Sequence, residues 1–143
     1  MIRDALVKAG IPDVRGVWTP ESSAGRMVIV VSIKQRYCGH SRQAAYVASQ
    51  CQTGAYLNRY VIVVDEDIDP ANTEEVMWAI STRSDPATDI DIMRKSWSGP
   101  IDPWCGTAIP PITPARSSML AGRSTGSTSF PKSPKRTRPI CAR

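Results

Sequence analysis

Dense apolar runs alternate with segments whose apolar residues recur at helical spacing. The runs are rich in β-branched residues and predict strands at residues 14–18, 27–33, 60–64 and 90–93. The helical spacing predicts helices at residues 2–9, from 41 to 51 and from 72 to about 83. The order αββαβαβ favours an α/β fold, a single sandwich domain with a mostly parallel or mixed sheet.

Local signals mark the ends of these helices. Gly10 is suited to stop the first helix, and Ser41 is a candidate N-cap for the second. Asn72 followed by Glu75 fits a capping box for the third, which Asp85-Pro86 would end.

Charge divides the chain into two parts. The net charge is +5, but seven of the Lys and Arg residues and none of the acids lie beyond residue 103. Residues 1–103 are therefore mildly acidic, and residues 104–143 form a basic low-complexity tail rich in Ser, Thr and Pro, which we expect to be disordered.

Nothing in the sequence suggests export or a membrane. It has no apolar stretch long enough to span a bilayer and no signal-peptide pattern, so a cytoplasmic protein is expected. The four cysteines show no paired spacing, and free thiols are therefore expected.

Four carboxylates directly follow the strand predicted at 60–64, namely Asp65, Glu66, Asp67 and Asp69. Three of them match the first ligand spacings of an EF-hand loop, but Pro70 and Val76 stand where that loop needs Gly and Glu. The other interpretation is that the acids stabilise the next helix and bind loop backbone. The spacing alone does not assign their role.

A second group of polar residues follows the strand predicted at 27–33. Lys34 and Arg36 precede a predicted helix N-terminus, an arrangement suited to phosphate as well as to an ordinary solvated strand end. His40, the single histidine, suits a capping or loop role. Its spacing from Cys38 and Cys51 matches no zinc pattern, and the chain has no nucleophile elbow or glycine-rich phosphate loop.

Four stretches together resemble the C-terminal domain of UbiD family decarboxylases: GIPDVRGVW, VVSIKQRYCGHSRQAA, GAYLNRYVIVVDEDIDP and WAISTRSDPATDIDI. The resemblance covers residues 1–103 in order. It implies reversible non-oxidative decarboxylation of aromatic or unsaturated acids with prenylated FMN, Mn²⁺ and K⁺. It also implies upstream domains as partners and a homo-oligomeric complete enzyme.

The family's catalytic Glu-Arg-Glu set and metal ligands belong to those upstream domains, so no catalytic or metal residue is assigned here. The resemblance does place Lys34 where the family has a lysine that reaches the cofactor phosphate. The chain alone is therefore expected to be an inactive fragment of a carboxy-lyase.

The tail departs from the family pattern. Read one frame over, with permitted codons, Ala115 to Arg138 can encode AIIDACRPFDWIDEFPKVAETDP, which looks like a family ending. We expect residues 104–143 to be an out-of-frame translation. Two other functions stay open: a separately encoded structural or regulatory subunit, and a binding module using the basic tail. Nucleic acid is not the expected partner, because the tail lacks interleaved aromatic residues.

Overall fold

The computed structural model describes residues 1–94, 96–99, 102 and 118–121. The elements follow the predicted order, with a short 3₁₀ helix, η1, before the second strand and one further strand in the tail. They are α1 (Ile2–Lys8), β1 (Val14–Trp18), η1 (Glu21–Ser23), β2 (Val28–Ile33), α2 (His40–Gln50), β3 (Tyr60–Asp65), α3 (Thr73–Arg83), β4 (Ile90–Met93) and β5 (Ser118–Ala121).

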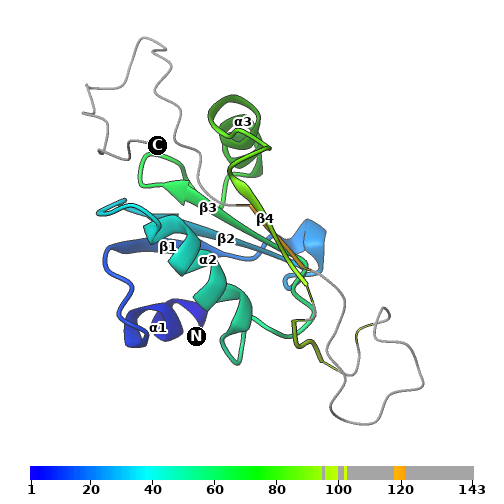
Figure 1. Ribbon diagram of the computed structural model, residues 1–143. Coiled ribbons are helices and arrows are strands. Elements are labelled where there is room, and N and C mark those ends of the chain that lie inside the picture. Colours follow the sequence, from blue (N-terminus) through cyan, green and yellow to red (C-terminus); the bar gives the residue numbers. More distant parts are fainter. Residues whose placement is uncertain (95, 100–101, 103–117, 122–143) are drawn as a thin grey trace.

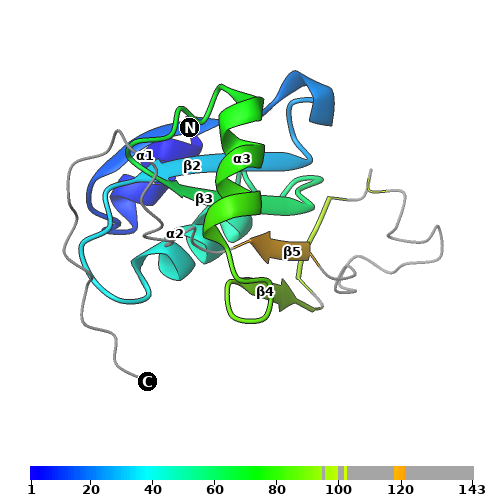
Figure 2. The same cartoon turned by 90° about the horizontal axis from the view of Figure 1, so that it is seen from above.

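The five strands form one mixed sheet in the order β1-β2-β3-β5-β4. β2 and β3 are parallel, as are β3 and β5, while β1 and β4 run antiparallel to their neighbours. Helices α1 and α2 cover one face and α3 covers the other (Figure 1 and Figure 2). The α/β sandwich with a mixed sheet is therefore confirmed.

The central strands are buried on both faces, as their continuous apolar sequences predict. Alternate residues of β2 and β3 face α1 and α2, where they join Leu6 in a core with Ala44, Ala45 and Ala48. The intervening residues face α3 and pack with Ile68, Val76 and Ala79. Small alanines on α2 allow that helix to lie close against the sheet.

Asn72 caps α3 as predicted, but the second half of the capping box is not formed, because the Asn72 backbone N–H donates to the Asp69 carbonyl at 3.1 Å and not to Glu75. The Asn72 side chain accepts hydrogen bonds from the backbone N–H groups of Glu74 and Glu75 at 3.1 and 3.4 Å.

The predicted cap of α2 is wrong. At α2 the N-cap is Gly39 rather than Ser41, which lies buried in the first turn. The cap residue has φ +83°, a left-handed conformation that glycine adopts without strain.

The tail and the cysteines also differ from expectation. Residues Ser118–Ala121, within the segment expected to be disordered, form β5 between β3 and β4. The rest of the tail beyond Asp102 lies outside the described residues. Cys51 is a free thiol, as predicted, but Cys38 is disulfide-bonded, so the expectation of free thiols is wrong there. Cysteine spacing gives no information on contacts between residues distant in sequence.

Candidate functional site

The carboxyl ends of β2 and β3 bring Lys34 and Glu66 together. The two strands are parallel and in register, with Ile33 opposite Asp65, so the next residue of each strand emerges at the same edge of the sheet. The Lys34 Nζ atom lies 3.5 Å from Glu66 Oε1, and about one third of each side chain is exposed. The predicted Lys34 is thus placed at a strand end, facing one of the four predicted acids.

Arg15, on the neighbouring strand β1, completes this group. Its Nη2 atom lies 3.3 Å from Glu66 Oε2 and 3.9 Å from Asp13 Oδ1. The register of β1 against β2 shifts between Val14 and Gly16, so Arg15 is the extra residue of a β-bulge. The position of Arg15 could not be predicted from the sequence, because a bulge depends on pairing with another strand and leaves no spacing signal.

Arg36, the second cation selected from the sequence, is directed elsewhere. Its Nε atom donates a hydrogen bond to Asp13 Oδ2. This hydrogen bond lowers the pKa of Asp13 and raises that of Arg36, so both groups keep their charge. Arg36 therefore balances Asp13, while Lys34 and Arg15 share Glu66.

His40 is completely buried at the first position of α2. Its Nδ1 atom accepts a hydrogen bond from the backbone N–H of Arg36 at 3.3 Å, and its ring stacks on Tyr37 with centroids 4.6 Å apart. Burial lowers the pKa of His40, although the Pro12 carbonyl and the Asp13 charge oppose this. The neutral ring thus fixes the loop that connects Lys34 to α2, in agreement with the predicted loop role.

Two of the four acids named from the sequence, Asp67 and Asp69, organise the loop that leads into α3, as the second interpretation proposed. Asp67 pairs with Arg83 on α3, and the Asp69 side chain accepts from the backbone N–H of Ala71 at 2.9 Å. Glu75 in turn accepts from the backbone N–H of Asp69 at 3.2 Å. Among these four acids, Glu66 is the one that contacts Lys34 and Arg15.

A depression of about 480 Å³ lies beside this charged group, between β1, β2 and the loop after β3. Arg15, Ser32 and Glu66 line it together with Asp67, Asp69 and Glu75. The Ser32 hydroxyl donates to the Asp65 carbonyl at 3.3 Å, which ties the two strand ends together. A ligand at this edge would therefore meet an ordered rim of charged side chains.

Within the described residues, no group of three His, Cys, Asp or Glu side chains is placed to hold a metal ion. The described residues therefore give no support to a calcium site at the acids after β3 or to a metal site formed by Cys38, His40 and Cys51.

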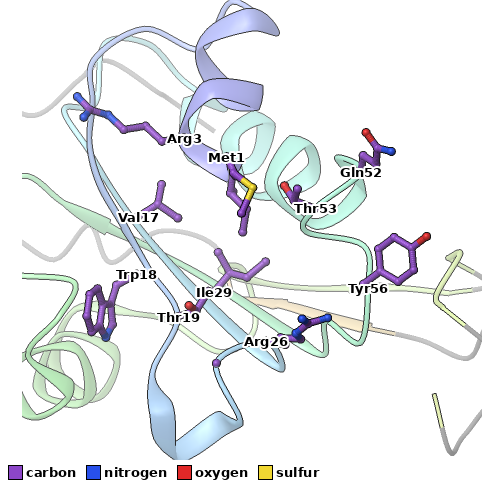
Figure 3. A pocket seen from close by; sticks show the side chains of 12 residues that line it. Met1, Arg3, Val17, Trp18, Thr19, Arg26, Ile29, Gln52, Thr53 and Tyr56 are labelled. Atoms are coloured by element: carbon purple, nitrogen blue, oxygen red, sulfur yellow. The ribbon is translucent and has the colours of Figure 1, made fainter. Parts of the chain in front are cut away.

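The larger groove, about 840 Å³, lies at the opposite end of β2. Met1, Val17 and Ile29 line its middle, and Arg3 and Tyr56 lie toward its periphery (Figure 3). None of its lining residues is an acid, a histidine or a cysteine. It therefore offers no acid–base group, and the candidate site remains the edge that carries Lys34.

The described part of the chain contains no helix with the length and apolar character needed to cross a bilayer.

Residues 2–108 match the family model for the 3-octaprenyl-4-hydroxybenzoate carboxy-lyase C-terminal domain. A phenolic acid decarboxylase from Sedimentibacter hydroxybenzoicus is 39% identical over 75 residues, which are 52% of this chain and 16% of that protein. The match therefore involves about a sixth of the relative's length.

Solved structures share the fold. The vanillic acid decarboxylase of S. hydroxybenzoicus, in its open form, superposes with a TM-score of 0.69 at 28% identity. HmfF from Pelotomaculum thermopropionicum, solved in complex with FMN, gives a TM-score of 0.73 at 21% identity. Each superposition covers 96% of this chain but only 28% of the solved chain.

Proposed function

Because this chain belongs to the UbiD family of carboxy-lyases, by its match to their C-terminal domain, we propose that it serves as that domain in a prenylated-FMN-dependent decarboxylase. The proposed substrates are aromatic or unsaturated acids. Two relatives support this choice by name, a phenolic acid decarboxylase and a vanillic acid decarboxylase. A UbiD-class relative has been solved with FMN and another form of it with prenylated FMN, which supports the cofactor.

The position of Lys34 carries the proposal for this chain's own role. A lysine at the carboxyl end of a parallel strand is suited to the phosphate of a flavin. When bound, the prenylated flavin supplies the electron sink for loss of CO₂. Lys34 would donate a hydrogen bond to the phosphate and hold the cofactor, while the buried His40 ring fixes the loop behind it.

In this proposal, acid–base chemistry and the Mn²⁺ and K⁺ sites belong to upstream domains. Residues 1–103 would form the C-terminal domain of a homo-oligomeric enzyme of the cytoplasm. Residues 104–143 would be the out-of-frame translation of its natural ending. Alone, the chain would then have no decarboxylase activity.

Domain replacement tests this function. Residues 1–103 of this chain replace the superposing segment of the S. hydroxybenzoicus vanillic acid decarboxylase. The chimera is supplied with prenylated FMN and assayed for release of CO₂ from vanillic acid. The proposal predicts retained activity in the chimera and none in the isolated chain. A folded chimera that neither binds flavin nor releases CO₂, or turnover by the isolated chain, would contradict it.

A further inference from the structure

The loop that joins β2 to α2, residues 34–39, closes on a buried histidine. His40, the first residue of α2, is completely buried, whereas residues 36–39 are exposed. The backbone N–H of Arg36 donates to the His40 Nδ1 atom at 3.3 Å, across the turn. We propose that His40 is a proton-controlled lock, which holds this loop while its ring is neutral and releases it when the ring takes up a proton.

The direction of this hydrogen bond is the first argument. A ring nitrogen that accepts a hydrogen bond carries no proton, so the neutral His40 ring has its proton on Nε2. A second proton can be added only at Nδ1, where it would face the N–H of Arg36. Two donors cannot bond to each other. Protonation of the ring and closure of this contact therefore exclude each other.

The surroundings of the ring are the second argument. Nε2 makes no hydrogen bond within the part of the chain that the structure describes. A charged ring would be buried at the N-terminus of an 11-residue helix, whose positive end disfavours a cation. Arg36 also opposes the charge, while the Pro12 carbonyl and the Asp13 carboxylate favour it. Burial is the largest of these effects and lowers the pKa of His40, so a protonated ring gains by moving into water.

The weakness of the surface contacts is the third argument. Gln35 donates to the Tyr37 carbonyl at 2.8 Å, and the Tyr37 hydroxyl donates to Gln43 Oε1 at 2.5 Å. Both hydrogen bonds are exposed, so water competes with them. The Tyr37 ring stacks on the His40 ring, with centroids 4.6 Å apart, and loses that support when the histidine moves. The closed loop thus depends on the buried ring more than on its own surface contacts.

The lock bears on the proposed function through Lys34, and this part of the inference rests on that function. The Lys34 backbone N–H donates to the Asp13 carbonyl at 3.0 Å, a contact that does not involve the ring. The released residues begin directly after Lys34, so opening of the loop widens the range of positions that its side chain samples. His40 would be a positioning residue, because it acts on the cofactor only through this lysine.

Nuclear magnetic resonance of the full 143-residue chain between pH 7.5 and 5 tests the lock. His40 is the single histidine, so its ring nitrogens report its protonation without overlap. Dithiothreitol is present, so that the disulfide of Cys38 does not hold the loop. We expect Nδ1 to carry no proton at pH 7.5. As the ring titrates, with a midpoint below the ordinary 6.5, the hydrogen-exchange protection factor of the Arg36 amide should fall at least about tenfold.

Two variants of the histidine and one control residue complete the design. His40→Asn keeps an acceptor that does not titrate, so its loop should stay protected down to pH 5. His40→Leu has no acceptor, so its Arg36 amide should be unprotected at every pH. The pKa of Asp13 is lowered, so this carboxylate keeps its charge over the whole range and does not cause the transition. The signals of the buried Leu6 report whether each variant is folded.

Three results would overturn the lock. They are a ring that titrates while the Arg36 amide keeps its protection, a proton on Nδ1 at pH 7.5, and a loop transition that persists in His40→Asn.

The chimera separates the lock from the function on which its consequence rests. Its FMN affinity should fall more between pH 7.5 and 5 than that of the same chimera with His40→Asn. Protonation of the phosphate itself, near pH 6, affects both proteins alike. Equal losses of affinity would show that the lock does not act on the cofactor. A folded chimera that binds no FMN at pH 7.5 would contradict the proposed function, while the isolated chain still decides the lock.

Discussion

Asp67 accepts two hydrogen bonds from the Arg83 guanidinium, from Nη1 to Oδ1 at 3.0 Å and from Nη2 to Oδ2 at 2.8 Å. The pair joins the loop after β3 to the last residue of α3, sixteen positions later. Arg83 also lies over the ring of Trp78, 4.9 Å from its centroid. The C-terminal end of α3 is thus held against the loop after β3 by a charged contact.

Removing this contact should loosen α3. Arg83 is mostly buried while Asp67 is 41% exposed, so the pair is a partly screened one. We expect Arg83→Ala to lower the free energy of unfolding by about 1 kcal/mol, because it loses a paired hydrogen bond and the contact with Trp78. Urea denaturation of this variant beside Lys8→Ala measures the difference. Equal midpoints would show that the contact contributes nothing.

The N-cap of α3 gives a second stability prediction. Asn72→Ala should cost about 1 kcal/mol, because the N–H groups of Glu74 and Glu75 lose their acceptor. Asn72→Asp keeps the acceptor and places a negative charge at the positive end of the helix, so it should cost little. Thermal unfolding of the two variants decides the point, and an equal loss in both would contradict the cap.

Two adjacent residues of α1 test the core. Leu6 is fully buried and Val7 is 59% exposed. Leu6→Ala should destabilise the protein by about 2–5 kcal/mol through lost burial and a residual cavity. Val7→Ala should change stability by less than about 0.5 kcal/mol. Similar effects in chemical denaturation would mean that α1 is oriented differently on the sheet.

The buried histidine predicts a pH dependence. Burial lowers the pKa of folded His40 below its unfolded value, so the unfolded chain binds the proton more readily. The stability contributed by neutral His40 is fully present above the unfolded pKa, near 6.5, and is lost as pH falls below it. Asp13, with a lowered pKa, adds its own loss only below about pH 4.

Unfolding midpoints measured between pH 7.5 and 5 should therefore fall in the wild type. Because His40 is the single histidine, His40→Asn should flatten this slope. Asn also keeps an acceptor for the backbone N–H of Arg36. A slope that survives in His40→Asn would assign the pH dependence to other groups.

The coding DNA tests the proposed division of the chain at residue 103. In the frame shifted by one position, the codons for Ala115 to Arg138 should read AIIDACRPFDWIDEFPKVAETDP. The sequencing needs no protein. A shifted frame that encodes any other string, or stop codons, would show that the basic tail is the natural ending of this chain.

Much of the fold could be predicted from the sequence because strand and helix patterns are local. β1 and β4 have the predicted bounds, and β2 and β3 differ from prediction by one residue at one end. The predicted N-cap of α2, Ser41, is wrong because the chain enters this helix through the left-handed conformation of Gly39, which the serine pattern does not indicate. β5 was missed because its four residues, SMLA, have no alternating pattern and gain their pairing from β3 and β4.

The candidate site was only partly predictable, because its residues meet through contacts between strands that are distant in the sequence. Lys34 and the acids after β3 stand at strand ends, which the sequence marks by an apolar run followed by charges. Their meeting depends on the parallel register of β2 and β3, which brings residues 32 positions apart to 3.5 Å. Arg15 depends further on a bulge in an antiparallel edge strand, for which a single sequence gives no signal.

The central claim is that Lys34 holds the cofactor phosphate in a complete enzyme. The most direct measurement compares FMN and riboflavin affinities in the chimera described above, with and without Lys34→Ala, and repeats the alanine substitution at the residue of the S. hydroxybenzoicus enzyme that superposes on Lys34. We predict that alanine weakens FMN binding at least about tenfold and leaves riboflavin binding unchanged. Unchanged FMN affinity in both proteins would contradict the account.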